Sequence, residues 1–277
     1  MQAELPGALV PPDGRYVVRG HAGEPTHVLV VQSLLAARAG TARLGRRRTR
    51  AAPPEPPPAE VPVTRVTLVG AEPFAGEDAA RAWLDGADGE REAATAFDVL
   101  RRVLHAHRIA SADPSVAEPA REQALVVRLG LGEGEQVADG RWTSAVELPP
   151  PPARRRGGRR AALQPQERLA ALLGGRDAAL ACEELTLRAR ADLDAGRARE
   201  AAFQVRVALE AALAELVPWA ERDDLAARLE ELRAERTAVG DAANAALQGG
   251  LTAEQAADVE RVVGRLEAAL RARVLEA

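Results

Sequence analysis

The pattern of apolar and polar positions along the chain changes its period near the middle. Residues 15–19 (RYVVR) alternate, which predicts a strand with Tyr16 and Val18 on one face. Residues 26–34 (THVLVVQSL) form a nearly continuous apolar run, which is typical of a central strand covered on both faces. Residues 63–70 (VTRVTLVG) are rich in β-branched side chains and predict a third strand.

Two helices and two more strands follow. Residues 77–84 (EDAARAWL) predict a short helix, and residues 90–110 predict a longer helix with a single apolar stripe. That stripe consists of Ala93, Phe97, Leu100 and Leu104. Residues 124–131 and 141–148 predict two further strands.

The connection between these last two strands contains Asp139 and Gly140, a pair that favours a two-residue hairpin turn. Strands that come before and after the helices, without regular alternation, indicate an α+β domain with a mostly antiparallel sheet. We assign this domain to residues 1–148. Within it we expect a disordered insertion, rich in arginine and proline, at about residues 40–62.

The second half has the helical period throughout. From Gln164 onward, apolar residues recur every three or four positions, with breaks at Ala195-Gly196 and Pro218-Trp219. The stripes consist of Ala178, Cys182, Leu185 and Ala189; Ala201, Val205, Ala208 and Ala212; Leu225, Leu229 and Leu232; and Ala256, Val259, Val263, Leu266, Leu270 and Val274.

The last helix opens with Thr252 and Gln255, whose spacing predicts a capping box. Four or five helices with short connections predict an all-α, antiparallel bundle over residues 162–277. A linker rich in proline and arginine, residues 149–161, joins the bundle to the first domain.

One segment of the bundle resembles a known family. Residues 189–213 (ARADLDAGRAREAAFQVRVALEAAL) are similar to the helix–turn–helix hairpin of tetratricopeptide repeats. In this resemblance Gly196 is the turn, and Ala201, Ala208 and Leu209 lie on the second helix. The aromatic positions of the family's first helix are missing, and no second copy follows at the repeat spacing. The resemblance therefore implies one helical hairpin and not a repeat array.

Composition limits the sites that this chain can build. Only 3% of the residues are aromatic, so a helical scaffold is favoured over a deep pocket for a small molecule. The basic residues are all arginine, which excludes a Schiff-base lysine and the lysine of a phosphate-binding P-loop. The single cysteine, Cys182, excludes an internal disulfide and any multi-cysteine metal site.

The sequence also bears on location. Its first residues have neither a basic region nor an apolar run, so we expect no secretory signal. No window approaches the roughly 18 uninterrupted apolar residues of a membrane span. We therefore expect a cytoplasmic protein that does not span a membrane.

The histidines do not predict a metal site. His105 and His107 are two residues apart on a predicted helix and point about 200° away from each other, so they cannot share a metal ion. We expect His107 to pack with the apolar stripe and His105 to lie at the surface. His21 and His27, near the first two strands, are given no ligand role.

Two other features have a structural explanation. Cys182 lies on an apolar stripe beside Glu183 and Glu184, and burial and acidic neighbours both raise a thiol pKa, so we expect a buried, inert side chain. The glycine-rich residues 128–140 precede a predicted hairpin instead of a helix, so they favour a strand connection over a phosphate site. No cofactor, metal or catalytic residue is assigned.

Two arginine tracts remain, RLGRRRTRAAPPEPPP (43–58) and PPPPARRRGGRR (149–160). Their candidate anion-binding residues are Arg43, Arg46, Arg47, Arg48, Arg50, Arg154, Arg155, Arg156, Arg159 and Arg160. Arginine binds phosphate through paired hydrogen bonds and needs no folded support. The tracts contain no aromatic residue to stack on bases, however, and charged, proline-rich segments also serve as solvated linkers or contact acidic surfaces.

These observations favour a non-catalytic interaction or scaffold protein. Its C-terminal helices are predicted to bind a protein partner or a second copy of the chain. The alternative is binding of nucleic acid or another polyanion through the arginine tracts. A third hypothesis is an enzyme of unknown class, which requires Tyr16, Trp142, His27 or His107 to meet a carboxylate in one pocket.

Overall fold

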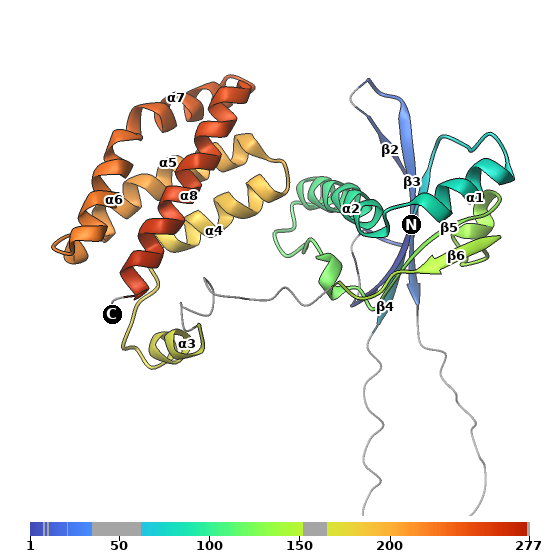
Figure 1. Ribbon diagram of the computed structural model, residues 1–277, viewed down its shortest axis with the longest axis horizontal. Helices are drawn as coiled ribbons and strands as arrows, with labels where there is room; N and C mark the ends of the chain where they lie inside the picture. Colours follow the sequence, from blue (N-terminus) through green and yellow to red (C-terminus); the bar gives the residue numbers. More distant parts are fainter. Residues whose placement is uncertain (8, 10, 21, 35–61, 152–164, 276–277) are drawn as a thin grey trace, which may run out of the picture. The chain divides into compact units, whose positions relative to one another are not determined.

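The chain forms two compact units, Met1–Ala153 and Arg154–Ala277. The computed structural model describes residues 1–7, 9, 11–20, 22–34, 62–151 and 165–275. In these ranges the first unit combines a sheet with helices, and the second unit is helical (Figure 1). The α+β class predicted for the first half, with its antiparallel sheet, is confirmed.

The sheet of the first unit has six strands. They are β1 (Gln2–Pro6), β2 (Gly14–Arg19), β3 (Pro25–Leu34), β4 (Val63–Gly70), β5 (Val126–Leu131) and β6 (Ser144–Glu147). Their order is β2-β3-β4-β1-β5-β6, and all neighbouring strands are antiparallel. Sequence analysis did not predict β1, which lies between β4 and β5 although it is short and carries Gln2 and Glu4 on one face.

Helices α1 (Glu77–Gly86) and α2 (Gly89–Ser111) cover one face of this sheet (Figure 1). We call it the helix face. Alternate strand residues point toward it, because successive side chains of a strand lie on opposite faces. The predicted stripe of α2 is confirmed, since Ala93, Phe97, Leu100 and Leu104 are all buried against the strands.

The interior of β3 is covered on both faces, as its apolar run predicts. The consecutive residues Leu29, Val30 and Val31 are only 1%, 7% and 2% exposed. On the face opposite the helices, the segment between β5 and β6 lies over the sheet. There the Gln2 side-chain amide donates to the carbonyl oxygens of Val137 and Ala138, both at 3.4 Å.

The two-residue hairpin predicted at Asp139 and Gly140 is wrong. Strands β5 and β6 do pair, but a longer connection joins them, with a 3-10 turn (η2) at Gly134–Val137. The positive φ of Gly140 (78°) belongs to this connection, which is closed by a hydrogen bond from the amide of Arg141 to Gln136 (3.0 Å). A local turn signal therefore marked the bend but not its length.

The described part of the second unit contains six α-helices, where four or five were predicted. They are α3 (Pro165–Leu173), α4 (Ala181–Asp194), α5 (Ala198–Glu215), α6 (Asp223–Ala234), α7 (Arg236–Leu247) and α8 (Ala253–Leu275). Short 3-10 turns lie at Arg121–Gln123 (η1) in the first unit and at Val217–Trp219 (η3) here. Helix α8 contacts α4, α5, α6 and α7, and alanine, valine and leucine side chains of these helices form one core.

Local signals in this unit were informative. The capping box is present: the amide of Gln255 donates to Thr252 Oγ1 (3.2 Å), and the amide of Thr252 donates to Gln255 Oε1 (3.0 Å). The predicted break at Gly196 is the turn between α4 and α5, with φ of 72°. Ala178 is a correction, because it precedes α4 and is exposed, whereas Cys182 and the other stripe residues of α4 face the core or its edge.

Candidate functional site

The candidate residues of the two arginine tracts cannot be placed in a site. All ten candidate anion-binding residues lie outside the described residues: Arg43, Arg46, Arg47, Arg48, Arg50, Arg154, Arg155, Arg156, Arg159 and Arg160. Their role therefore stays a prediction from the sequence.

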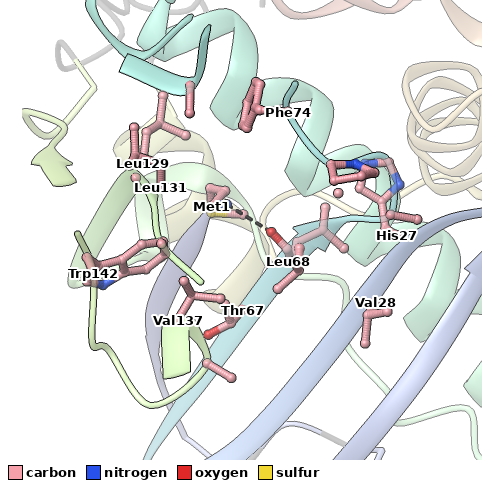
Figure 2. A pocket seen from close by; sticks show the side chains of 18 of the residues that line it. Met1, His27, Val28, Thr67, Leu68, Phe74, Leu129, Leu131, Val137 and Trp142 are labelled. Atoms are coloured by element: carbon pink, nitrogen blue, oxygen red, sulfur yellow. Dashed lines mark hydrogen bonds between the residues drawn. The ribbon is translucent and has the colours of Figure 1, made fainter. Parts of the chain in front are cut away.

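A cleft of about 900 Å³ lies in the first unit, at the end of the sheet where β1 begins. In the view of Figure 2, Met1 lies in the middle of the cleft, between Phe74 and Trp142. Leu68 lines the cleft from the helix face, and Thr67, its neighbour in β4, lines it from the opposite face. The cleft therefore extends from one face of the sheet to the other.

Aromatic side chains gather at this cleft. Two of the chain's three tryptophans, Trp83 and Trp142, line it together with Phe74. The rings of Phe74 and Trp83 lie 5.4 Å apart at an interplanar angle of 43°, on the helix face. Because aromatic residues are rare in this sequence, their gathering marks the cleft as a candidate recognition site.

Trp142 is held against the backbone of β5. A Cβ atom at Gly130 would lie 2.7 Å from Trp142 Cε3 and 2.7 Å from the carbonyl oxygen of Ser144. Only glycine leaves room for the indole there. The glycine-rich residues 128–140 were predicted to serve a strand connection. Gly130, within β5, also leaves the space in which the Trp142 indole packs.

The charged side chains at the cleft are mostly acidic. Four glutamates line it against a single arginine, Arg15. These glutamates are Glu72, Glu77, Glu92 and Glu133. Glu77 also forms a surface ion pair with Arg81 (2.7 Å). The excess of carboxylates favours a positively charged ligand and disfavours a phosphate, as the sequence also indicated.

Two nitrogen groups in the cleft have lowered pKa values. Burial, with smaller contributions from Arg102 and the terminal amine, lowers the pKa of His27 below its ordinary value. Burial also lowers the pKa of the Met1 amine to about 6, against an opposing effect of Glu92. This amine donates to the carbonyl oxygen of Leu68 at 2.9 Å (Figure 2). Both groups are therefore mostly neutral at pH 7 and add little positive charge to the cleft.

Two of the four side chains that the enzyme hypothesis named meet carboxylates in this cleft, and the other two lie elsewhere. His27 and Trp142 share the cleft with carboxylates, whereas Tyr16 and His107 do not line it. The Tyr16 hydroxyl donates to the carbonyl oxygen of Pro12 (2.6 Å). His105 is not simply a surface residue, since its Nδ1 lies 2.9 Å from Arg108 Nη2 and 3.7 Å from a Glu118 oxygen.

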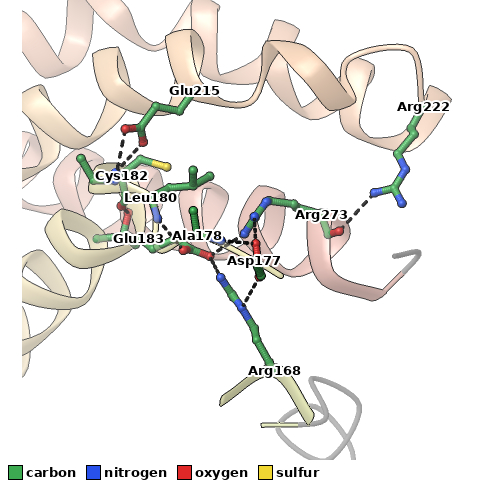
Figure 3. A network of polar contacts seen from close by, with 11 residues as sticks. Arg168, Asp177, Ala178, Leu180, Cys182, Glu183, Glu215, Arg222 and Arg273 are labelled. Atoms are coloured by element: carbon green, nitrogen blue, oxygen red, sulfur yellow. Dashed lines mark hydrogen bonds and ion pairs between the residues drawn. The ribbon is translucent and has the colours of Figure 1, made fainter. Parts of the chain in front are cut away.

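A second polar cluster lies in the helical unit. Arg273 of α8 is 5% exposed and donates to Asp177 Oδ1 (2.8 Å) and Glu183 Oε1 (3.1 Å) (Figure 3). Its guanidinium also lies 4.6 Å from the ring centre of Trp219. Arg168 of α3 reaches Glu183 as well, at 2.6 Å. Two guanidinium groups are thus paired with two carboxylates, and we call this group of Arg168, Arg273, Asp177 and Glu183 the clasp. Because its charges balance, its role is structural.

Cys182 lies beside these ion pairs and is buried, as predicted. It is 0% exposed, and burial, followed by a hydrogen bond with Glu215, raises the pKa of its thiol to about 12. Glu215 also accepts the backbone amides of Ala181 (3.2 Å) and Cys182 (2.9 Å), and so caps the start of α4 (Figure 3). The acidic neighbour that matters most comes from α5, which the sequence did not indicate.

No group of three or more metal-ligating side chains is placed to hold an ion among the residues that the structure describes. Over the same residues, no helix is both long enough and apolar enough to cross a membrane. The chain matches no protein-family model, no curated protein and no solved structure.

Proposed function

We propose that this chain is a non-catalytic binding protein, and that the cleft of its first unit holds a positively charged ligand with an apolar or aromatic body. One observation carries this proposal: three scarce aromatic side chains and four carboxylates, against one arginine, line a single cleft. Aromatic faces attract organic cations, and acidic walls raise the local concentration of cations.

The size of the cleft supports the same function. A volume of about 900 Å³ lies within the range of roughly 300–1,000 Å³ that is usual for ligand sites. The aliphatic side chains of Val28, Val69 and Leu131 supply the apolar part of the walls. A ligand with a charged group and an apolar body therefore matches both kinds of surface.

Fluorescence titration with benzyltrimethylammonium tests this proposal. In a Trp219→Phe background the remaining tryptophans, Trp83 and Trp142, both line the cleft, so the emission reports on it directly. We expect saturable quenching by this cation and none by benzenesulfonate, which has a similar ring and the opposite charge. Equal quenching by both compounds would refute the electrostatic part of the proposal, and no saturation by either would refute the function.

A matched pair of variants isolates the carboxylates. In Glu72→Gln/Glu133→Gln the cleft loses two charges, and in Glu24→Gln/Glu184→Gln the same charge is removed from residues that do not line it. Unit charges about 6 Å apart in a water-like dielectric attract by roughly 0.7 kcal/mol, so each lost carboxylate is expected to weaken binding about threefold. The second variant is expected to bind like the parent protein.

The helical unit supplies a second candidate function, the protein contact predicted from the sequence. Its support is α3, on which Leu169 and Leu173 are 55% and 81% exposed. We also retain the resemblance of the α4–α5 hairpin, turning at Gly196, to one tetratricopeptide-repeat unit. A Leu169→Ser/Leu173→Ser variant that loses concentration-dependent association would support this role, and a parent chain that stays monomeric at high concentration would exclude self-association.

Self-association through the stripe of the last helix is not favoured. Val259, Val263 and Leu266 are 1%, 0% and 0% exposed, because the unit's own helices cover them. The polyanion role of the arginine tracts and the cytoplasmic location stay predictions of the sequence. A titration with heparin, compared between the parent chain and a variant with both tracts changed to serine, tests the former through its salt dependence.

A further inference from the structure

We propose that copies of this chain associate head to tail, by pairing the outer edge of β6 in one copy with the outer edge of β2 in the next. The partner of each edge is thus a second copy of the chain, and the sheets of successive copies join into one. This association does not depend on the ligand of the cleft. Three properties of the two edges support it: strand direction, main-chain groups and charge.

Strands β2 and β6 are the two ends of the sheet. In the part of the chain that the structure describes, each pairs with one neighbour, β3 or β5, and has no partner on its other edge. The sheet has six strands and all neighbours are antiparallel, so β2 and β6 run in opposite directions. A second copy in the same orientation therefore brings its β2 antiparallel to β6, with the helices of both copies on the same face of the joined sheet.

Two residues of β2 turn their main chain to the outer edge. The carbonyl oxygen of Thr26 accepts a hydrogen bond from the amide of Ala71, which follows β4 (2.9 Å), so the even-numbered residues of β3 face β4. The odd-numbered residues therefore face β2, where one of them pairs with Tyr16. Because orientation alternates along β2 as well, Tyr16 faces β3, and its neighbours Arg15 and Val17 present their N–H and C=O groups to the outer edge.

Two residues of β6 do the same. The amide of Leu148 donates to the carbonyl oxygen of Val127 (2.8 Å), so Leu148 faces β5. By the same alternation Val146 also faces β5, whereas Ala145 and Glu147 present their main-chain groups to the outer edge. Each edge therefore offers two residues, and each residue carries one donor and one acceptor.

One register joins the two edges residue by residue. When Arg15 lies opposite Glu147 of the second copy, Val17 lies opposite its Ala145. Both pairs join outward-facing residues, so they are the hydrogen-bonded pairs of an antiparallel ladder and supply up to four main-chain hydrogen bonds. The same register places a positive side chain opposite a negative one and an apolar side chain opposite another.

The side chains of the helix face match in this register as well. Tyr16 and Leu148 pack into the core on that face, so Val146, two residues before Leu148, lies on it too. Tyr16 then comes opposite Val146 of the second copy, an aromatic and β-branched pair of the kind that stabilises antiparallel strands. Val17 and Val146 are 56% and 50% exposed, and no other large apolar side chain of the described strands is exposed. The pairing places each of them beside an apolar side chain of the other copy.

The charges of the two edges select unlike partners. A row of alternating charges crosses the face opposite the helices, through contacts of 2.9, 3.7 and 3.0 Å between Arg65, Glu4, Arg128 and Glu147. The row ends at Glu147, whose side chain is 59% exposed even with Arg128 beside it. Arg15 of the next copy adds the next positive charge to this row. Two β2 edges would instead bring arginines together, and two β6 edges would bring glutamates together, so like edges repel each other.

Pairing of unlike edges does not close at two copies. Each copy uses β6 for one neighbour and β2 for the other, and such head-to-tail contacts generate rings or open chains of copies. A junction of two hydrogen-bonded residue pairs is small, so we expect the association to require a high protein concentration.

Charge reversal in the full chain tests the pairing, with sedimentation over a range of concentrations as the measurement. The parent chain is expected to form species larger than a dimer as its concentration rises. Arg15→Glu or Glu147→Arg alone places like charges opposite each other and is expected to weaken association about tenfold. An equimolar mixture of these two variants is expected to regain association, because each junction between unlike variants again joins opposite charges. Glu200→Arg, at an exposed position of α5, is the matched control and is expected to associate like the parent.

A main-chain variant gives a second readout. Val17→Pro removes an N–H group that faces the outer edge, so it keeps the hydrogen bonds within the sheet and blocks an added strand. We expect at least a tenfold loss of association. Val17→Thr keeps the N–H group and the branched shape and is the matched control. Circular dichroism confirms that the variants fold, and if a charge variant does not fold, the two Val17 variants decide.

The outcomes separate this association from other contacts and from the cleft. A parent chain that stays monomeric at high concentration contradicts the proposal, and so does an association that stops at the dimer or survives Val17→Pro. Loss of association in Leu169→Ser/Leu173→Ser, with none in the edge variants, assigns the contact to α3 and contradicts it as well. Arg15 also lines the cleft, so its variant is judged by association and not by ligand binding.

Discussion

Arg273 offers a sharp test of what holds the helical unit together. Its side chain is 6% exposed and pairs with Asp177 and Glu183, which lie before and within the first turn of α4. In Arg273→Met the apolar stem is kept and the charge is lost. Both carboxylates then remain beside each other, and among the residues that the structure describes Arg168 is left to pair with them.

The expected cost follows from burial. Removing one partner of a buried ion pair destabilises a protein by about 3–5 kcal/mol, because the remaining charge stays buried without compensation. Here Asp177 is 28% exposed, and Arg168 still contacts Glu183 at 2.6 Å, so part of that charge stays solvated or paired. We therefore expect the lower end of the range, about 3 kcal/mol.

Urea unfolding of the full chain measures this loss. In a Trp83→Phe/Trp142→Phe background, Trp219 is the remaining tryptophan and reports on the helical unit. Arg271→Met on the same helix is the control. Its contact with Glu267 is 4.0 Å long and about one-third exposed, and ion pairs near the surface contribute about 0–1 kcal/mol. If Arg273→Met costs no more than Arg271→Met, the clasp does not stabilise the unit and the reasoning is wrong.

Three further predictions address backbone conformation and pH. Gly196→Ala is expected to destabilise the helical unit by about 1 kcal/mol, because the φ of Gly196 is 72°. Gly264→Ala, inside α8 with open space around it, is expected to stabilise the unit by about 0.5–1 kcal/mol. Urea unfolding would contradict this reasoning if both variants changed the unfolding free energy in the same direction. Folding raises the pKa of the Cys182 thiol from 9.0 to about 12. Its contribution to stability is therefore present below pH 9 and lost as the pH rises toward 12. Between pH 9 and 12 the unfolding free energy of Cys182→Ala should decline less steeply than that of the parent chain. Binding of benzyltrimethylammonium should weaken as the pH falls below about 6, because the Met1 amine and the His27 imidazole gain positive charge, and pH-independent affinity would contradict this.

Local signals in the sequence predicted much of the fold. The alternation around Tyr16, the stripe through Phe97 and the capping box at Thr252 each involve residues within a few positions of one another. Their patterns are set by the geometry of a single strand or helix, so they can be read without knowing the tertiary structure. The same is true of the turn at Gly196.

The central strand and the cleft could not be found in this way. β1 is a strand because β4 and β5 bind its two edges, and those partners lie far along the chain. The cleft joins side chains from β3, β4, β5, α1 and the connection to β6, so no spacing in the sequence brings them together. The scarcity of aromatic residues argued against a deep pocket, whereas the fold brings Phe74, Trp83 and Trp142 to one cleft.

The most direct test of the cleft is an amide spectrum of the isotope-labelled full chain, titrated with benzyltrimethylammonium. The account predicts that the largest shifts fall on the indole N–H groups of Trp83 and Trp142, which line the cleft, and that they saturate together. If these signals stay in place while others move, or if none moves, the cleft is not the binding site.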